Sequence, residues 1–297
     1  MIVMSNTLYV IGNGFDIDHQ INSRYSDYRE YCCAKDKDTY ILLNNIYRKP
    51  EELWCDFENG LPYIECEAFF KVADHMRIER NLPTDIEIEN TADVLCHIWQ
   101  SMRDWISEVD STILSKCRKY DFNNLQDSIF LTFNYTTTLE TLYKIPHDQV
   151  RHIHGCVGRD VIEDVDLSQI IIGHGKSREE IDEIFSECAD EKVKDELKCI
   201  LDKCLRKDTD RIISKDYKEF FEDLSNIDTI YILGHSMAAV DMPYFVKIRD
   251  SVKKTAKWNV SIFGDEETKR RKMSELGIDP KLCKYAQICK LLPAKCE

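Results

Sequence analysis

The sequence lacks the features of several large protein classes. No apolar run approaches the roughly 20 residues of a membrane-spanning helix. The start of the chain has neither a basic segment nor a small-residue cleavage site, so we expect no signal peptide. Its 13 cysteines include no CxxC pair, which argues against a zinc ribbon. Their odd number and the missing secretion signal predict reduced thiols in a soluble, cytoplasmic protein.

Basic residues are too few to balance the acidic ones. The chain has 40 Lys and Arg against 54 Asp and Glu, a formal net charge of -14. Nucleic-acid affinity depends mainly on cations that neutralise phosphates, so this balance disfavours a nucleic-acid partner. The net negative charge does not exclude a local basic pocket that binds a small dinucleotide. With 43% hydrophobic and 32% charged residues, the composition is that of a globular protein.

Short apolar runs predict buried strands at 7–11, 128–133, 170–172 and 229–233, with weaker candidates at 149–153 and 258–263. The long segments between them read as helices. We therefore expect a Rossmann-like, three-layer α/β fold with a parallel sheet and a large helical insertion. The expected parts are a nucleotide-binding core at 1–19 and 126–297, a helical insertion at 20–125, and a second helical insertion or flap at 177–224. Mixed charges at 177–210 predict a solvated helix face.

Polar residues cluster where these strands end. In an open parallel sheet, ligands bind beyond the carboxyl ends of the strands. The first strand runs into Gly12-Asn13-Gly14, followed by Asp16. Such glycines allow a backbone to approach a pyrophosphate, although the third glycine of a full G-x-G-x-x-G is Ile17. A tight structural turn with Asp16 as helix N-cap is the alternative.

The later strand ends carry candidate catalytic groups. Asn134 could hold a ribose hydroxyl or orient water, and its alternative role is a helix cap. His154, next to Gly155, could act as general base near neutral pH, the alternative being a core histidine. Strand alternation predicts that His152 and His154 face the same side.

Two Gly-His turns follow apolar runs, Gly173-His174-Gly175 and Gly234-His235-Ser236. Ser236 and neighbouring amides could hold phosphate or ribose, and Asp241 could reach the same cleft. Simple strand-to-helix connections are the alternative.

Together these segments resemble the AbiH family of bacteriophage abortive infection proteins. The resemblance rests on VIGNGFDIDHQINSRYSDY at 10–28, WCDFENGL at 54–61, FNYTTTLETLY at 133–143, HIHG at 152–155, IIIGHG at 170–175 and YILGHSMAAVDMPYF at 231–245. It implies a role in antiviral defence, in which an infected bacterium stops growing or dies before phage can spread.

More remotely, the arrangement resembles sirtuin-like NAD-binding domains. That resemblance implies that Gly12 and Gly14 meet the pyrophosphate, Asn134 the nicotinamide ribose and Ser236 the adenosine side, with His154 as base. Two features depart from the pattern. Thr136 stands where an Asp usually follows the Asn, and the CxxC zinc site of deacetylases is missing. The second departure argues against deacylation and leaves NAD cleavage, or binding without turnover.

Three functions therefore compete. The first is a defence protein that binds NAD or a related nucleotide and acts as a glycohydrolase. The second is a metal-dependent phosphohydrolase or nuclease with ligands among Asp16, Asp18, His19, His152, His154, His174, His235 and Asp241. The third is a non-catalytic sensor that binds a nucleotide or a protein. The expected partners are a small-molecule nucleotide and a phage or host trigger protein, without a membrane, and the sequence allows a homo-oligomer.

Overall fold

The computed structural model describes residues 6–79, 87–123, 125–157 and 170–295, without the side chains of 73–96 and 126. Residues 80–86 and 124 of the expected insertion, and 158–169 of the expected core, lie outside this description. The chain forms two compact units. The first comprises Met1–Ser23, Ile106–Ile170 and Asp208–Glu297, and the second Arg24–Trp105 and Ile171–Lys207. Of the two expected insertions, 24–105 and 177–207 thus belong to the second unit, whereas 20–23, 106–125 and 208–224 belong to the first.

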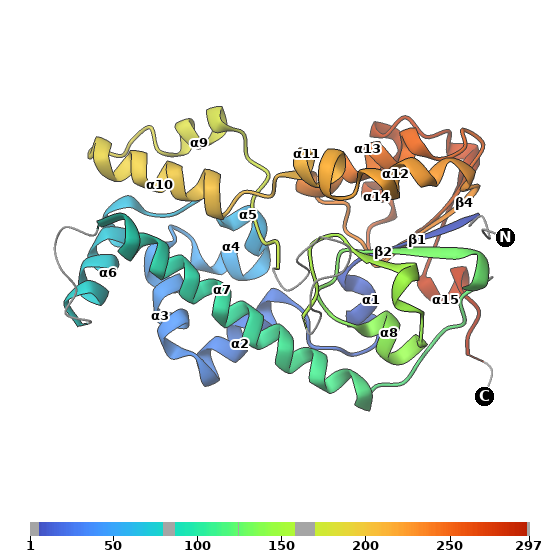
Figure 1. Cartoon of the computed structure of the whole chain (residues 1–297), viewed down its shortest axis with the longest axis horizontal. Coiled ribbons are helices and arrows are strands. Elements are labelled where there is room, and N and C mark those ends of the chain that lie inside the picture. The colour runs from blue at the N-terminus through green and yellow to red at the C-terminus, as the bar shows by residue number, and fades with distance from the viewer. Residues whose placement is uncertain (1–5, 80–86, 124, 158–169, 296–297) are drawn as a thin grey trace. The chain divides into compact units, whose positions relative to one another are not determined.

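The first unit is built on a six-stranded sheet in the order β3-β2-β1-β4-β5-β6, and every strand pair is parallel (Figure 1). The strands are β1 (Thr7–Ile11), β2 (Ser128–Thr132), β3 (Val150–His152), β4 (Thr229–Leu233), β5 (Lys257–Ser261) and β6 (Cys283–Ala286). The strand order reverses between β1 and β4, as in the Rossmann fold. The expected α/β fold class is confirmed.

Helices cover both faces of this sheet. Figure 1 shows α12, α13 and α14 over one face and α1, α8 and α15 over the other. The α-helices assigned wholly to this unit are α1 (Asn13–Asp18), α8 (Thr138–Tyr143), α11 (Thr209–Arg211), α12 (Lys218–Glu222), α13 (Met242–Ser251), α14 (Glu266–Glu275) and α15 (Ile288–Leu291). Alternate residues of β1 point to opposite faces, so Tyr9 and Ile11 join Phe15 and Tyr143 in one aromatic-rich core cluster.

Two strand assignments from the sequence need correction. The run at 170–172 is not a strand; past it, His174 makes only an isolated bridge with Arg206 in the second unit. Close backbone packing explains the glycine there, because a Cβ on Gly173 would lie 2.6 Å from the Leu205 carbonyl oxygen. In contrast, β6 was not expected. It is a partly exposed edge strand, and its residues Cys-Lys-Tyr-Ala form no apolar run.

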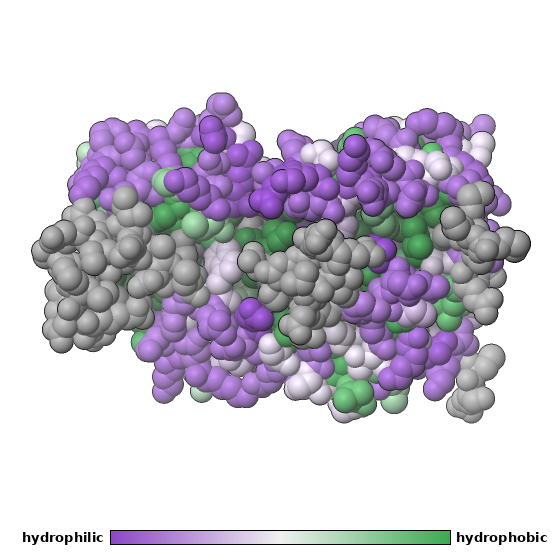
Figure 2. Space-filling view, in the orientation of Figure 1, coloured by the Kyte–Doolittle hydropathy of each residue, from purple (hydrophilic) through white to green (hydrophobic). Residues whose placement is uncertain are grey.

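The second unit is helical. Its helices are α2 (Tyr25–Lys35), α3 (Lys37–Ile46), α4 (Pro50–Cys55), α5 (Phe57–Gly60), α6 (Cys66–Glu79), the greater part of α7 (Glu87–Thr112), α9 (Arg178–Ile184) and α10 (Glu191–Cys204). Ion pairs such as Arg178–Asp202, at 2.8 Å, link α9 and α10. Hydrophilic residues cover the visible face of these two helices (Figure 2), as their mixed charges predict.

Two further observations concern the whole described chain. Among the described residues, no helix is both long and apolar enough to cross a membrane. The 11 cysteines whose state is described form no disulfide with one another.

Candidate functional site

Two turns pack against each other where the strand order reverses. We call residues 12–16 the β1 turn and residues 234–237 the β4 loop. The Gly12 amide donates to the Leu233 carbonyl at 2.9 Å, and the Gly14 amide donates to the Gly234 carbonyl at 2.8 Å. A Cβ on Gly14 would lie 2.7 Å from the Gly234 oxygen, and one on Gly234 would lie 2.1 Å from the Phe15 nitrogen. These glycines are required for the contact between the two turns.

This packing bears on the expected phosphate site at the β1 turn. The Gly14 amide is bonded to the β4 loop, and the Phe15 amide donates to the Gly12 carbonyl at 2.9 Å. The exposed Asn13 side chain bonds to Ser23, with Nδ2 2.7 Å from the Ser23 carbonyl oxygen and Oδ1 2.5 Å from its hydroxyl. The turn therefore uses most of its polar groups within the protein.

Asp16 is a buried acid in this turn. It is fully buried inside α1, whose N-cap is Gly12, so the expectation that Asp16 caps the helix is wrong. One carboxylate oxygen accepts a 2.5 Å hydrogen bond from the Thr136 hydroxyl, whereas Oδ1 has no partner among the described residues. Burial raises the pKa of Asp16 to about 6, although hydrogen bonds from Thr136, Thr138 and Asn134 oppose the shift.

Asn134 lies beside it at the end of β2. Its side-chain Nδ2 donates to the Gly12 carbonyl at 3.3 Å, which ties β2 to the β1 turn. Its Oδ1 is buried and has no partner among the described residues. Because buried polar groups are nearly always hydrogen-bonded, the unpaired oxygens of Asn134 and Asp16 call for an explanation.

Both ring nitrogens of His152 have hydrogen-bond partners within the protein. Its Nδ1 lies 3.0 Å from the Asn134 carbonyl oxygen and its Nε2 3.0 Å from Glu140 Oε1. Burial alone would lower the pKa of His152. Cys156 and the Asn134 carbonyl raise it by more than burial lowers it, so the net shift of the pKa is upward. Both ring nitrogens face acceptors, which makes this histidine a link between β3 and α8.

His154 has different neighbours, because residues 153 and 154 form a turn that ends the strand alternation. Its Nε2 lies 3.2 Å from the Tyr244 hydroxyl of α13, and its ring packs edge-on against Phe133 at 5.2 Å. Gly155 follows with φ 83°, a left-handed conformation that favours glycine. The two histidines thus contact helices on opposite faces of the sheet, α8 and α13 (Figure 1).

The β4 loop holds a second His–acid pair. The Met237 amide donates to His235 Nδ1 at 2.8 Å, which leaves the proton of the neutral ring on Nε2. That nitrogen lies 3.6 Å from Asp241 Oδ2. Both side chains are almost completely buried, whereas Ser236 is exposed. The structure therefore brings His235 and Asp241 together, while Ser236 faces solvent.

Two lysines of α14 also contact the β4 loop, and sequence reasoning missed both. Lys269 donates to the His235 carbonyl, and Lys272 donates to the Ser236 and Met237 carbonyls at 3.0 and 2.7 Å. Burial and the neighbouring Lys272 lower the pKa of Lys269 to about 8. The two lysines are three residues apart and therefore share a helix face, which is the signal that could have found them. In the sequence this helix reads as a charged, solvated one.

The candidate metal ligands are dispersed. His19 has Nδ1 2.7 Å from the Phe15 carbonyl oxygen and Nε2 2.7 Å from the Tyr143 hydroxyl. Asp18 accepts from the Tyr120 hydroxyl at 2.7 Å, and His174 belongs to the second unit. Among the residues with described side chains, no three His, Cys, Asp or Glu are grouped so that they could hold a metal ion.

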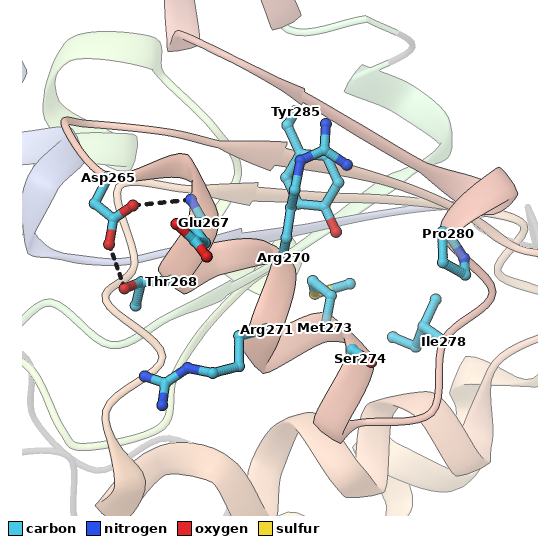
Figure 3. A pocket seen from close by; sticks show the side chains of 10 residues that line it. All are labelled: Asp265, Glu267, Thr268, Arg270, Arg271, Met273, Ser274, Ile278, Pro280 and Tyr285. Carbon is cyan, nitrogen blue, oxygen red and sulfur yellow. Dashed lines mark hydrogen bonds between the residues drawn. The ribbon is translucent and has the colours of Figure 1, made fainter.

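A separate cavity of about 570 Å³ lies along the other side of α14 (Figure 3). Arg270 lies over the Tyr285 ring at 4.3 Å and pairs with Glu266 at 2.6 Å. Met273 and Ile278 add apolar lining. These residues differ from the expected site residues at the strand ends.

The sheet order and the polar groups at its reversal define a doubly wound, Rossmann-like α/β protein with a buried polar site at the carboxyl ends of β1, β2 and β4. A family model described as Bacteriophage abortive infection AbiH matches residues 8–262. The chain belongs to this family, which indicates a role in abortive infection. No curated protein and no solved structure gives a significant match.

Proposed function

We propose that this AbiH protein binds NAD or a related nucleotide at the reversal of strand order and hydrolyses its nicotinamide N-glycosidic bond. The observation that carries the proposal is a pair of buried oxygens, on Asn134 and Asp16, that have no hydrogen-bond partner in the part of the chain that the structure describes. Ribose hydroxyls are donors that would satisfy both oxygens. The crevice at the reversal is also where open α/β sheets bind ligands.

Asp16 could take the place of an acid that the sirtuin-like pattern has and this sequence lacks. The sirtuin-like pattern has an acid two residues after the Asn, where this chain has Thr136. In the structure, the Thr136 hydroxyl bonds to Asp16 at 2.5 Å, so a carboxylate from the β1 turn stands next to that position. The arrangement supports a sugar-binding role for Asn134 and Asp16 together.

The proposed step is attack by water on C1′ of the nicotinamide ribose. A C–O bond forms as the C1′–N bond breaks, and the bonding electrons leave with neutral nicotinamide. The other products are ADP-ribose and one proton, which His154 accepts while the Tyr244 hydroxyl holds its ring. Asn134 and Asp16 fix the ribose, and this orientation supplies much of the rate enhancement.

The test is incubation of the purified protein with NAD, with and without phage lysate as a trigger, while nicotinamide and ADP-ribose are measured by chromatography. We expect wild type to release both products. Asn134→Ala and His154→Ala should lose at least about 100-fold in rate, the usual contribution of a general base or a positioning group. His147→Ala is the matched control, because His147 is exposed and precedes β3.

Three outcomes would contradict parts of the proposal. Full activity in either site variant would remove the role assigned to that residue. Tight NAD binding without turnover would favour the sensor hypothesis. Turnover of a phosphoester that stops in chelator would favour the metal-dependent hydrolase.

A further inference from the structure

Two cations beside the reversal of strand order come from α14. Lys269 and Lys272 both donate to carbonyl oxygens of the β4 loop. That loop is the one against which the β1 turn packs, since a Cβ on Gly12 would lie 2.5 Å from the His235 Cα. Two ammonium groups are therefore held beside the reversal of strand order in a chain whose net charge is -14.

These ammonium groups keep donors for a ligand. Each has three N–H donors. Among the described residues, Lys269 uses one on His235, and Lys272 uses two on Ser236 and Met237. Two donors of Lys269 and one of Lys272 thus remain.

The charge of Lys269 is also poorly compensated. Its pKa is lowered by burial and by the second cation, and both effects disfavour the charged form. Lys272 has some compensation from Glu275 and Asp241, although burial and Arg271 lower its pKa overall. A bound anion would offset both the burial and the mutual repulsion.

The other basic groups of α14 differ in this respect. Arg270 pairs with Glu266 at 2.6 Å, and Arg271 approaches Glu275 at 4.0 Å. The cavity beside them is also lined by Asp265 and Glu267 (Figure 3). Carboxylates there disfavour an anion, so the cavity is a poor alternative to the lysine pair.

We propose that Lys269 and Lys272 form a pyrophosphate site on the β4 side of the crevice, which takes the role that the sequence assigns to the glycines of the β1 turn. The inference rests on the proposed nucleotide-binding function and names where its phosphates bind. Both lysines lie beyond residue 262, the last residue that the family model matches.

The test is calorimetric titration of the full chain with inorganic pyrophosphate. We expect binding that weakens as salt rises. Lys269→Met and Lys272→Met should each weaken it at least about tenfold, the double variant should abolish it, and Lys269→Arg should retain it within about threefold. Lys284→Met is the matched control, since Lys284 is an exposed lysine on β6. Absence of binding to wild type, or unchanged binding to a folded double variant, would overturn the site.

A second measurement needs no variant. Pyrophosphate should protect Lys269 and Lys272, but not Lys284, from acylation by an amine-reactive ester, as measured by mass spectrometry of peptides. Equal labelling with and without pyrophosphate would overturn the site. The two proposals fail separately. Lysine-dependent pyrophosphate binding without NAD turnover contradicts only the function, and NAD turnover that is unaffected in the double variant contradicts only the site.

Discussion

The β1 turn and the β4 loop both follow an apolar strand and both begin with glycine, in Gly-Asn-Gly and Gly-His-Ser. They differ in the charged group that each one contacts. The β1 turn buries an acid, Asp16, among hydroxyl and amide groups. The β4 loop offers carbonyl oxygens to two lysines that lie 34 to 36 residues further along the chain. The glycines in both turns serve the contact between them.

The comparison teaches that a glycine turn after a strand does not by itself make a phosphate site. At the β1 turn, two amides that could meet a phosphate are bonded within the protein. At the β4 loop, the cations come from α14, outside the motif. We therefore expect sugar recognition on the β1 and β2 side and phosphate recognition on the β4 side.

The largest effect should come from Gly234→Ala, which breaks the contact between the turns. Gly234 has φ +66°, and a Cβ there would lie 2.1 Å from the Phe15 nitrogen. We expect a loss of at least about 3 kcal/mol in unfolding free energy, from backbone strain and overlap together. Urea unfolding measures it, with Gly264→Ala as control. Gly264 also has a positive φ, +85°, but nothing lies within 4 Å of its added Cβ. Equal losses in both variants would contradict the packing role.

Asp16→Asn tests whether the β1 turn buries an acid whose pKa is raised. Burial raises the folded-state pKa of Asp16 from 3.8 to about 6. The folded protein therefore binds this proton more tightly, and the resulting stability is complete below the unfolded pKa and lost as pH rises through about 6. The variant should gain stability over wild type as pH rises from about 4 to 6, by up to about 3 kcal/mol at pH 7. Thermal unfolding across this pH range measures it, and a difference that does not change with pH would contradict the account.

The smallest effect should come from Ser261→Ala on the β4 side. The Ser261 hydroxyl accepts a hydrogen bond from the Gly234 amide at 2.8 Å. We expect a loss of about 1 kcal/mol, the usual contribution of one hydrogen bond, with faster exchange of the Gly234 amide hydrogen. Ser274→Ala, at an exposed position of α14, is the control. Unchanged exchange at Gly234 would show that the loop does not depend on this bond.

Several elements of the fold could be predicted because their signals are local. β1, β2 and β4 lie inside the sheet, and a parallel strand covered on both faces is an apolar run in the sequence. The edge strand β6 has no such run. The segment at 170–172 has an apolar run but lies outside the sheet, because burial of an extended segment requires only packing and not strand pairing.

The site was predictable as a set of strand ends but not as a set of contacts. Asn134, Asp16, His154 and His235 were found because parallel strands bring their carboxyl ends to one edge. The spacing of Lys269 and Lys272 predicts only that they share a helix face. The contacts that Tyr244, Lys269 and Lys272 make with these strand ends could not be predicted, because each belongs to a helix that packs on the sheet from elsewhere in the chain.

Periodicity and motifs within short segments were enough to predict the α/β class, the AbiH family and the concentration of polar groups at strand ends. The folded structure was needed to show that the glycines close the two turns, that Asp16 supplies a carboxylate beside Asn134, and that the cations come from α14. The physical reason is that these are contacts between residues far apart in the chain, such as Asp16 and Thr136 at a separation of 120 residues. Local patterns carry no information about such pairs.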